Sequence, residues 1–246
     1  MHLFTQIFLF VAAASAAPSF KRKAKRPERA DINLVRDLIT APSMVDRINL
    51  IPKDSDFVFK FTDPPFTSGI SKGNGGHSVS ATRSTFPALI GSGVSMTLGF
   101  LDGCGFNTPH THPRAAEMNI MVDGRLKTQF IMENGARAVT NSLNRYDMTI
   151  FPPGAMHAEF NPDCTPATFV AGFGDEDHGV QQTAQAFFGL RNDMIDATLG
   201  VSGATVSGKD IDTYRELIPK NIALGVDKCL KKCGLKRNAK RNLDRW

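Results

Sequence analysis

The stretch Pro109-His110-Thr111-His112-Pro113-Arg114-Ala115-Ala116-Glu117, followed later by Pro152-Pro153-Gly154-Ala155-Met156-His157, decides the predicted fold. Residues two apart in a strand share a face, so His110 and His112 are expected to point together into a barrel. Pro113 cannot continue a ladder, which predicts a turn that places Glu117 on the next strand. Pro-Pro-Gly predicts a tight turn before a strand that starts at His157. Three imidazoles and one carboxylate can bind a divalent transition metal, so we predict that these four residues are its ligands.

Short apolar runs alternate with turn signals between Ser80 and Gly174, a pattern typical of a sandwich or jelly-roll barrel. Gly124 and Asn134-Gly135 are predicted to form hairpin turns. Residues 64–76 are rich in Gly, Ser and Pro and are expected to form a loop. The predicted strands are 57–61, 94–101, 118–122, 126–132, 148–151, 157–160 and 168–173.

Apolar residues take up helical spacing after Thr183. We predict helices over 184–190, 192–199, 212–218 and 222–232, and a short N-terminal helix over 31–38 with Asp31 as its cap. The C-terminal helices have too little core of their own, so their apolar face must dock on the barrel or on a neighbouring subunit.

The chain begins with features of a secretory signal peptide. Residues 3–14 are largely apolar, and Ala14-Ser15-Ala16 fits a small-residue cleavage site. This run is too short to span a bilayer, and no later stretch is long enough. We therefore expect a secreted protein, extracellular or in a cell wall, that does not sit in a membrane.

The net charge of +5 is unevenly distributed. Residues 21–26 carry +5 and residues 228–246 carry +7, so the segment between them carries −7. The basic segments are read as solvated tails, as dibasic processing sites at 21–26, or as a binding site for a polyanion such as an acidic cell-wall polysaccharide. Nucleic acid is not expected as a partner, because a recognised binding motif is missing.

A register argument predicts one disulfide among the four cysteines. Opposed residues of an antiparallel strand pair have a constant sum of residue numbers. If His110 and His157 are opposed, Cys104 and Cys164 lie nearly opposite as well, so we predict a Cys104–Cys164 bridge in an oxidising compartment. Cys229 and Cys233 are one helical turn apart; they could bridge at a frayed helix end, pair between subunits, or stay free.

The two histidine motifs resemble those of the cupin superfamily. Residues 105–115, residues 86–96 and Phe187-Phe188-Gly189 are similar to germins in particular, and the resemblance covers most of residues 30–225. Two positions depart from the pattern, which expects glycine where this chain has Cys104 and Tyr146. The resemblance implies a mainly β fold, a single cupin jelly-roll β-barrel with a C-terminal α-helical arm. We divide the chain into a signal peptide (1–16), a basic prosegment or linker (17–30), a germin-like cupin domain with its C-terminal helices (31–225) and a basic tail (226–246).

The germin resemblance also carries expectations about function. It implies Mn(II) as the metal, although the ligand set accepts other divalent transition metals. It implies a homo-oligomer in which the C-terminal arm clasps a neighbour, built from trimers. Two activities come with it: superoxide dismutation, and oxalate oxidation, in which a pair of asparagines holds the substrate. Asn107 matches the first asparagine and is a candidate catalytic residue, but Thr97 stands at the second, which disfavours oxalate.

Superoxide dismutation needs only a redox metal, an open coordination position and access for a small anion or dioxygen species. A different class of function is a structural or storage protein of a wall, as in the spherulins, which this chain also resembles. A third is a sugar- or ligand-binding cupin. No further carboxylate or lysine base stands out near the motifs, so isomerase chemistry has no support.

Overall fold

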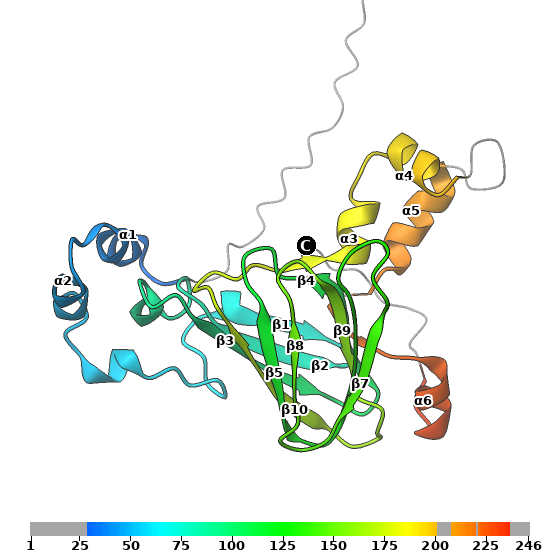
Figure 1. Cartoon of the computed structure of the whole chain (residues 1–246), viewed down its shortest axis with the longest axis horizontal. Helices are drawn as coiled ribbons and strands as arrows, with labels where there is room; N and C mark the ends of the chain where they lie inside the picture. Colours follow the sequence, from blue (N-terminus) through cyan, green and yellow to red (C-terminus); the bar gives the residue numbers. More distant parts are fainter. Residues whose placement is uncertain (1–28, 201–207, 220, 237–246) are drawn as a thin grey trace, which may run out of the picture.

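The structure is a computed structural model that describes residues 29–200, 208–219 and 221–236. The predicted signal peptide, nearly all of the predicted prosegment and residues 237–246 lie outside the described residues. Two antiparallel sheets form a barrel, and helical arms extend from its opposite ends (Figure 1). Within the ranges described, no helix is both long and apolar enough to cross a membrane.

The first sheet has the strand order β1-β2-β3-β10-β5-β8. In its central strands, β3 and β10, buried residues alternate with outward-facing residues, as expected where one face of a sheet covers a core. Phe169, Ala171 and Phe173 on β10 point inward together. The strands are β1 (Ile70–Gly73), β2 (Gly76–Ala81), β3 (Ser95–Leu101), β5 (Glu117–Asp123), β8 (Met148–Phe151) and β10 (Ala167–Phe173).

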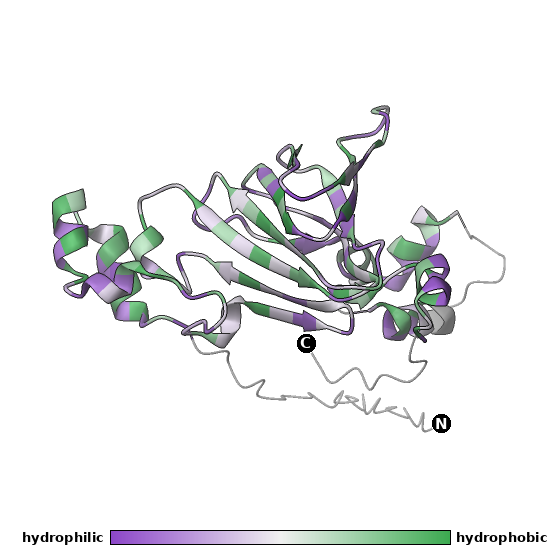
Figure 2. Ribbon diagram, turned by 90° about the horizontal axis from the view of Figure 1, so that it is seen from below, coloured by the Kyte–Doolittle hydropathy of each residue, from purple (hydrophilic) through white to green (hydrophobic). Residues whose placement is uncertain are grey.

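The second sheet has the order β11-β4-β9-β6-β7, and β12 adds to it by pairing with β4. Leu101, Met121, Leu126, Phe169 and Ile222 belong to the core between the two sheets. The alternation of hydrophobic and hydrophilic residues along the strands is visible in Figure 2. The strands are β4 (Gly105–Thr111), β6 (Leu126–Ile131), β7 (Val139–Leu143), β9 (Met156–Phe160), β11 (Gln181–Gln182) and β12 (Ile222–Leu224).

Six of the predicted strands are confirmed within one residue at each end, as β3, β5, β6, β8, β9 and β10. The strand predicted at 57–61 is wrong. A 3₁₀ helix, η1 (Asp54–Phe57), ends there, and Phe59 and Phe61 pack edge to face instead of alternating across a sheet. The loop predicted at 64–76 is partly wrong, because β1 forms within it after the short 3₁₀ helix η2 (Thr67–Gly69). A third 3₁₀ helix, η3 (Pro87–Leu89), precedes β3.

Both predicted hairpin turns are present, with Gly124 and Gly135 at positive φ (78° and 93°). The two residues that replace an expected glycine adopt the same left-handed region: φ is 57° at Cys104 and 72° at Tyr146. A side chain in this region is strained, which explains why glycine is expected at both positions.

The N-terminal arm consists of α1 (Ile32–Thr40) and α2 (Met44–Asn49). The predicted cap of α1 is confirmed, since Asp31 accepts a hydrogen bond from the Asn33 backbone. The C-terminal arm contains α3 (Thr183–Phe188), α4 (Asn192–Thr198) and α5 (Gly208–Leu217), close to three of the predicted helices. The fourth predicted helix, 222–232, is wrong at its start: β12 lies there and pairs with β4, and only α6 (Asp227–Lys232) is helical. Helix α6 also falls within the segment predicted as a basic tail.

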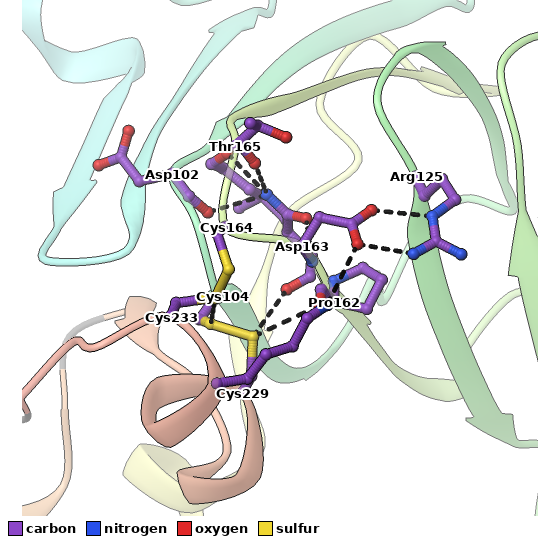
Figure 3. Close-up of a disulfide and its surroundings, with 12 residues drawn as sticks. Asp102, Cys104, Arg125, Pro162, Asp163, Cys164, Thr165, Cys229 and Cys233 are labelled. Carbon is purple, nitrogen blue, oxygen red and sulfur yellow. Dashed lines mark hydrogen bonds and ion pairs between the residues drawn. A yellow bond between two sulfur atoms is a disulfide. The ribbon is translucent and has the colours of Figure 1, made fainter.

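The predicted Cys104–Cys164 disulfide is wrong. Cys104 bonds to Cys229 and Cys164 bonds to Cys233, so two bridges fasten α6 to one end of the barrel (Figure 3). The His110–His157 register on which the prediction rested is confirmed, but a bulge between Asn107 and His110 shifts the pairing by one residue. β4 begins after Cys104 and β9 ends before Cys164, so neither cysteine lies within the paired part of these strands. Cys229 in α6 and Cys233, the residue after its end, are one helical turn apart and lie side by side, each within reach of a different barrel cysteine.

Candidate metal centre

The four predicted metal ligands come together at one end of the barrel. His110 is on β4, His112 follows directly after that strand, Glu117 begins β5 and His157 is on β9. All four side chains are buried, and one potential ligand atom from each lies within 4.8 Å of every other. The structure therefore contains the three-histidine, one-carboxylate cluster that the sequence predicts.

Backbone carbonyl groups fix the orientation of each imidazole. The Nδ1 atoms of His110 and His157 lie 2.8 and 2.9 Å from the carbonyl oxygens of Thr108 and Ala155. His112 Nδ1 lies 2.6 Å from the Gly179 oxygen. A carbonyl only accepts, so Nδ1 carries the hydrogen in all three rings, and Nε2 is left with a lone pair. Metal-binding histidines are held by contacts of this kind.

The Glu117 carboxylate faces two of these lone pairs. Its Oε2 atom is 2.9 Å from His112 Nε2 and 3.1 Å from His157 Nε2. Two acceptor atoms at such distances repel each other unless a cation lies between them. In the metal-free protein, a proton can be the cation that lies between them. A divalent metal coordinated by all four groups satisfies every lone pair, so the residues present fit a metal.

The electrostatics of the cluster favour the protonation states that a metal requires. Burial, and then repulsion by His157 and His112, lowers the pKa of His110 from 6.5 to about 3. Burial alone would raise the pKa of Glu117, but the close contacts with His112 and His157 outweigh it and hold that pKa below its usual value. His110 is therefore neutral and Glu117 ionised near neutral pH.

Aromatic rings and one loop enclose the cluster. Phe151 stacks on His157 with ring centroids 4.2 Å apart, and the Phe173 ring lies 4.6 Å from that of His112. The segment 175–180 supplies the Gly179 carbonyl described above. It is tethered by ion pairs of Asp177 with Arg83 and Arg114, each 3.1 Å long.

The same segment carries His178, which sequence reasoning missed. Its ring stacks on Phe173 at 3.7 Å, and its Nδ1 lies 2.8 Å from Ser95 Oγ. Burial, followed by repulsion from His112, lowers the pKa of His178 to about 4. His178 anchors the loop that orients His112. Its ring centroid is 5.0 Å from that of His112. Its spacing from the two histidine motifs in the sequence does not reveal it.

A second buried carboxylate, that of Glu159, also lies beside the cluster. The sequence motifs had pointed to no carboxylate other than Glu117 near the site. Its Oε1 atom is 3.9 Å from His157 Nε2. Burial, and then repulsion from Glu117, raises the pKa of Glu159 well above its usual value. The signal was available in the sequence, because Glu159 is two residues after His157 in a strand and therefore shares its face.

The two residues predicted to bear on oxalate binding are both engaged with neighbours. Asn107 is buried opposite Glu159, and its Nδ2 donates to Glu159 Oε2 at 2.9 Å. Thr97 Oγ1 lies 2.7 Å from Ser80 Oγ on the adjacent strand. One hydrogen of the Asn107 amide is therefore bonded to Glu159, whereas its Oδ1 has no hydrogen-bond partner among the described residues.

Comparisons with known proteins agree with this fold. Residues 62–207 match the Cupin family. Spherulin-1A of Physarum polycephalum is 43% identical over 205 residues, which cover 83% of this chain and 80% of that protein. Germin-like protein 9-3 of Oryza sativa subsp. japonica is 36% identical over 137 residues, covering 56% of this chain and 61% of that protein. A solved structure of oxalate oxidase has a TM-score of 0.58 at 23% identity, covering 67% of this chain and 81% of that chain, a likeness that shows the fold alone.

Proposed function

The chain belongs to the cupin family, and on this premise we propose that it is a secreted, Mn(II)-dependent redox protein acting on a small oxygen species such as superoxide. The observation that carries the proposal is the converging set of three Nε2 lone pairs and the Glu117 Oε2 atom. A bound Mn(II) would supply one-electron redox chemistry and Lewis acidity at the coordination positions that four protein ligands leave open.

The protein's own groups prepare this site. The carbonyl contacts hold each imidazole in the tautomer that binds a metal, so little reorganisation accompanies binding. Phe151 and Phe173 form apolar walls that limit the approach of bulk water and favour a small ligand. The donor set of nitrogen and oxygen without thiolate also suits Fe, Ni, Cu or Zn. The preference for manganese rests on the germin resemblance.

Oxalate oxidation is less well supported. A substrate carboxylate would need hydrogen-bond donors near the metal, but the Asn107 amide donates to Glu159 and the Thr97 hydroxyl is paired with Ser80. The hydroxyl of Thr97 lacks the paired donor and acceptor of an amide, so the site offers one amide where oxalate recognition is expected to need two.

A structural or storage role is the second candidate. It is favoured by the similarity to Spherulin-1A over 83% of the chain and by the two disulfides that fasten α6. In this role the metal stabilises the barrel without turnover, because a ligand that binds only the folded state adds to its stability.

The proposal includes a location and partners. Secretion is supported by the N-terminal sequence and by the disulfides, which persist in oxidising compartments. A homo-oligomer through the C-terminal helices is supported by apolar residues exposed on that arm, including Met194, Leu199 and Leu217. The lysines of α6 and the basic residues after it would suit an acidic cell-wall polysaccharide.

Activity assays separate these roles. The full-length secreted protein would be stripped with a chelator, reloaded with Mn(II), and assayed for superoxide and oxalate turnover. The proposal expects superoxide turnover that is lost on chelation and restored by Mn(II). Bound metal without either activity, but with a large fall in melting temperature on chelation, would support the structural role and refute the redox one.

A further inference from the structure

Asn119 lies beside the metal cluster and contacts one of its ligands. It is two residues after Glu117 on β5, so the two side chains share the inward face of the strand. Asn119 is fully buried, and its Nδ2 donates a hydrogen bond to Glu117 Oε1 at 2.9 Å. Neither the metal motifs nor the spacing argument drew attention to this residue.

The Glu117 carboxylate thus has a different neighbour at each oxygen. Oε1 accepts from Asn119, whereas Oε2 faces the Nε2 atoms of His112 and His157. The amide hydrogen bond opposes rotation of the carboxylate about its Cγ–Cδ bond. It also occupies the oxygen that would otherwise be free to make the carboxylate a two-oxygen ligand.

The orientation of the Asn119 amide follows from its partner. A carboxylate oxygen only accepts, so the amide nitrogen must face Glu117 and the amide oxygen must point away. That oxygen, Oδ1, has no hydrogen-bond partner within the described ranges. Burying an unsatisfied acceptor costs about 1–3 kcal/mol. An apolar side chain such as that of Met121, the next inward residue, would avoid this cost but would leave the buried Oε1 of Glu117 without its donor, so the asparagine is matched to that carboxylate.

The backbone around Asn119 is held on both sides. β5 lies between β10 and β8, and Asn119 is opposite Ala171 on one strand and Thr149 on the other. An interior strand of this kind gives the amide a fixed origin from which to hold the carboxylate.

We propose that Asn119 is a positioning residue for Glu117: its amide holds Oε1, so that Oε2 alone is presented to the metal together with the three imidazoles. This inference rests on the proposed metal-binding function but not on the identity of any substrate.

The test compares Mn(II) binding by full-length variants. Asn119→Leu keeps the number of side-chain heavy atoms and removes the donor, and Asn119→Ala is a second variant should the leucine prevent folding. Thr128→Val is the matched control, because Thr128 is buried in the same barrel and its hydroxyl makes no hydrogen bond among the described residues. The dissociation constant is measured by competition with a chelator, and the coordination of Mn(II) by electron paramagnetic resonance.

Loss of the Asn119 amide is expected to weaken Mn(II) binding about 10- to 100-fold. It is also expected to change the zero-field splitting of the bound ion, because Glu117 can then turn or bind through both oxygens. Thr128→Val should change neither quantity. The inference is overturned if the Asn119 variants bind Mn(II) within twofold of wild type and give the wild-type spectrum. Failure of the wild-type protein to bind Mn(II) would refute the proposed function itself. Metal binding without superoxide turnover would refute only the proposed activity, and the Mn(II) affinities of the variants would still decide the role of Asn119.

Discussion

His110 and His157 lie directly opposite each other on β4 and β9, and their ring centroids are 4.2 Å apart. Each ring is held by the carbonyl oxygen of the residue two positions earlier, Thr108 or Ala155. The backbone of β4 and that of the turn before β9 therefore fix the tautomers of the pair, and the strand register fixes their spacing. A metal centre built in this way depends on barrel register more than on flexible side-chain packing.

Replacing His112 by alanine should abolish stoichiometric metal binding and lower the melting temperature of the metal-loaded protein. His112 supplies one Nε2 atom and faces Glu117, so its loss removes a ligand and leaves that carboxylate with fewer partners. His77→Ala is the matched control, since His77 stacks on Phe100 outside the cluster. Metal content by mass spectrometry decides the matter, and a His112→Ala protein with wild-type metal content would rule out the ligand assignment.

Acid should destabilise the metal-free protein as the pH falls from 6.5 toward 4. The pKa of His178 is lowered to about 4, first by burial and then by repulsion from His112. The unfolded chain binds a proton near pH 6.5 that the folded chain binds only near pH 4, so protonation favours unfolding within this window. The loss for this one histidine is on the order of 3 kcal/mol.

Urea unfolding of the chelator-treated protein across this pH range measures the effect. His178→Gln should reduce the slope of the unfolding free energy against pH, while His110, whose folded pKa is about 3, continues to contribute across this window and below it. Equal slopes in wild type and variant would show that His178 does not titrate differently on folding.

Peptide mapping under non-reducing conditions should recover Cys104 linked to Cys229 and Cys164 linked to Cys233. The double variant Cys164→Ser/Cys233→Ser should lower the free energy of unfolding by about 2–4 kcal/mol, because the unfolded chain gains freedom when the bridge is absent. Recovery of a Cys104–Cys164 peptide from the native protein would contradict the structure.

Thr97→Asn combined with Glu159→Leu should raise oxalate turnover above that of either single variant. The first change supplies a second amide, and the second removes the side-chain acceptor that now bonds to Asn107. Thr97→Val is the control for loss of the Ser80 contact. Equal oxalate turnover in the double variant and in wild type, with metal bound in both, would remove these residues as determinants of oxalate use.

The sequence predicted those parts of the structure that depend on local spacing. His110, His112, Glu117 and His157 could be placed together because strand periodicity and the Pro-Pro-Gly turn carry that information. Glu159 shares the face of His157 and could have been found by the same rule. His178 could not, because its position depends on how the segment after β10 folds back onto Ser95 and Phe173.

The disulfides show why long-range pairing was harder to predict. A bulge after Asn107 shifts the strand register, and neither a bulge nor the approach of α6 is encoded in residue spacing. The apolar spacing from residue 222 onward likewise predicted a helix, but Ile222 lies in β12 because the edge of β4 offers backbone partners. In both cases tertiary contacts overrode a local pattern.

Metal analysis of the full-length protein, purified after secretion, tests the central claim most directly. The account predicts about one manganese ion per chain, retained through dialysis and removed by a strong chelator. Protein that is folded and disulfide-bonded but holds no stoichiometric metal, even after exposure to Mn(II), would contradict it.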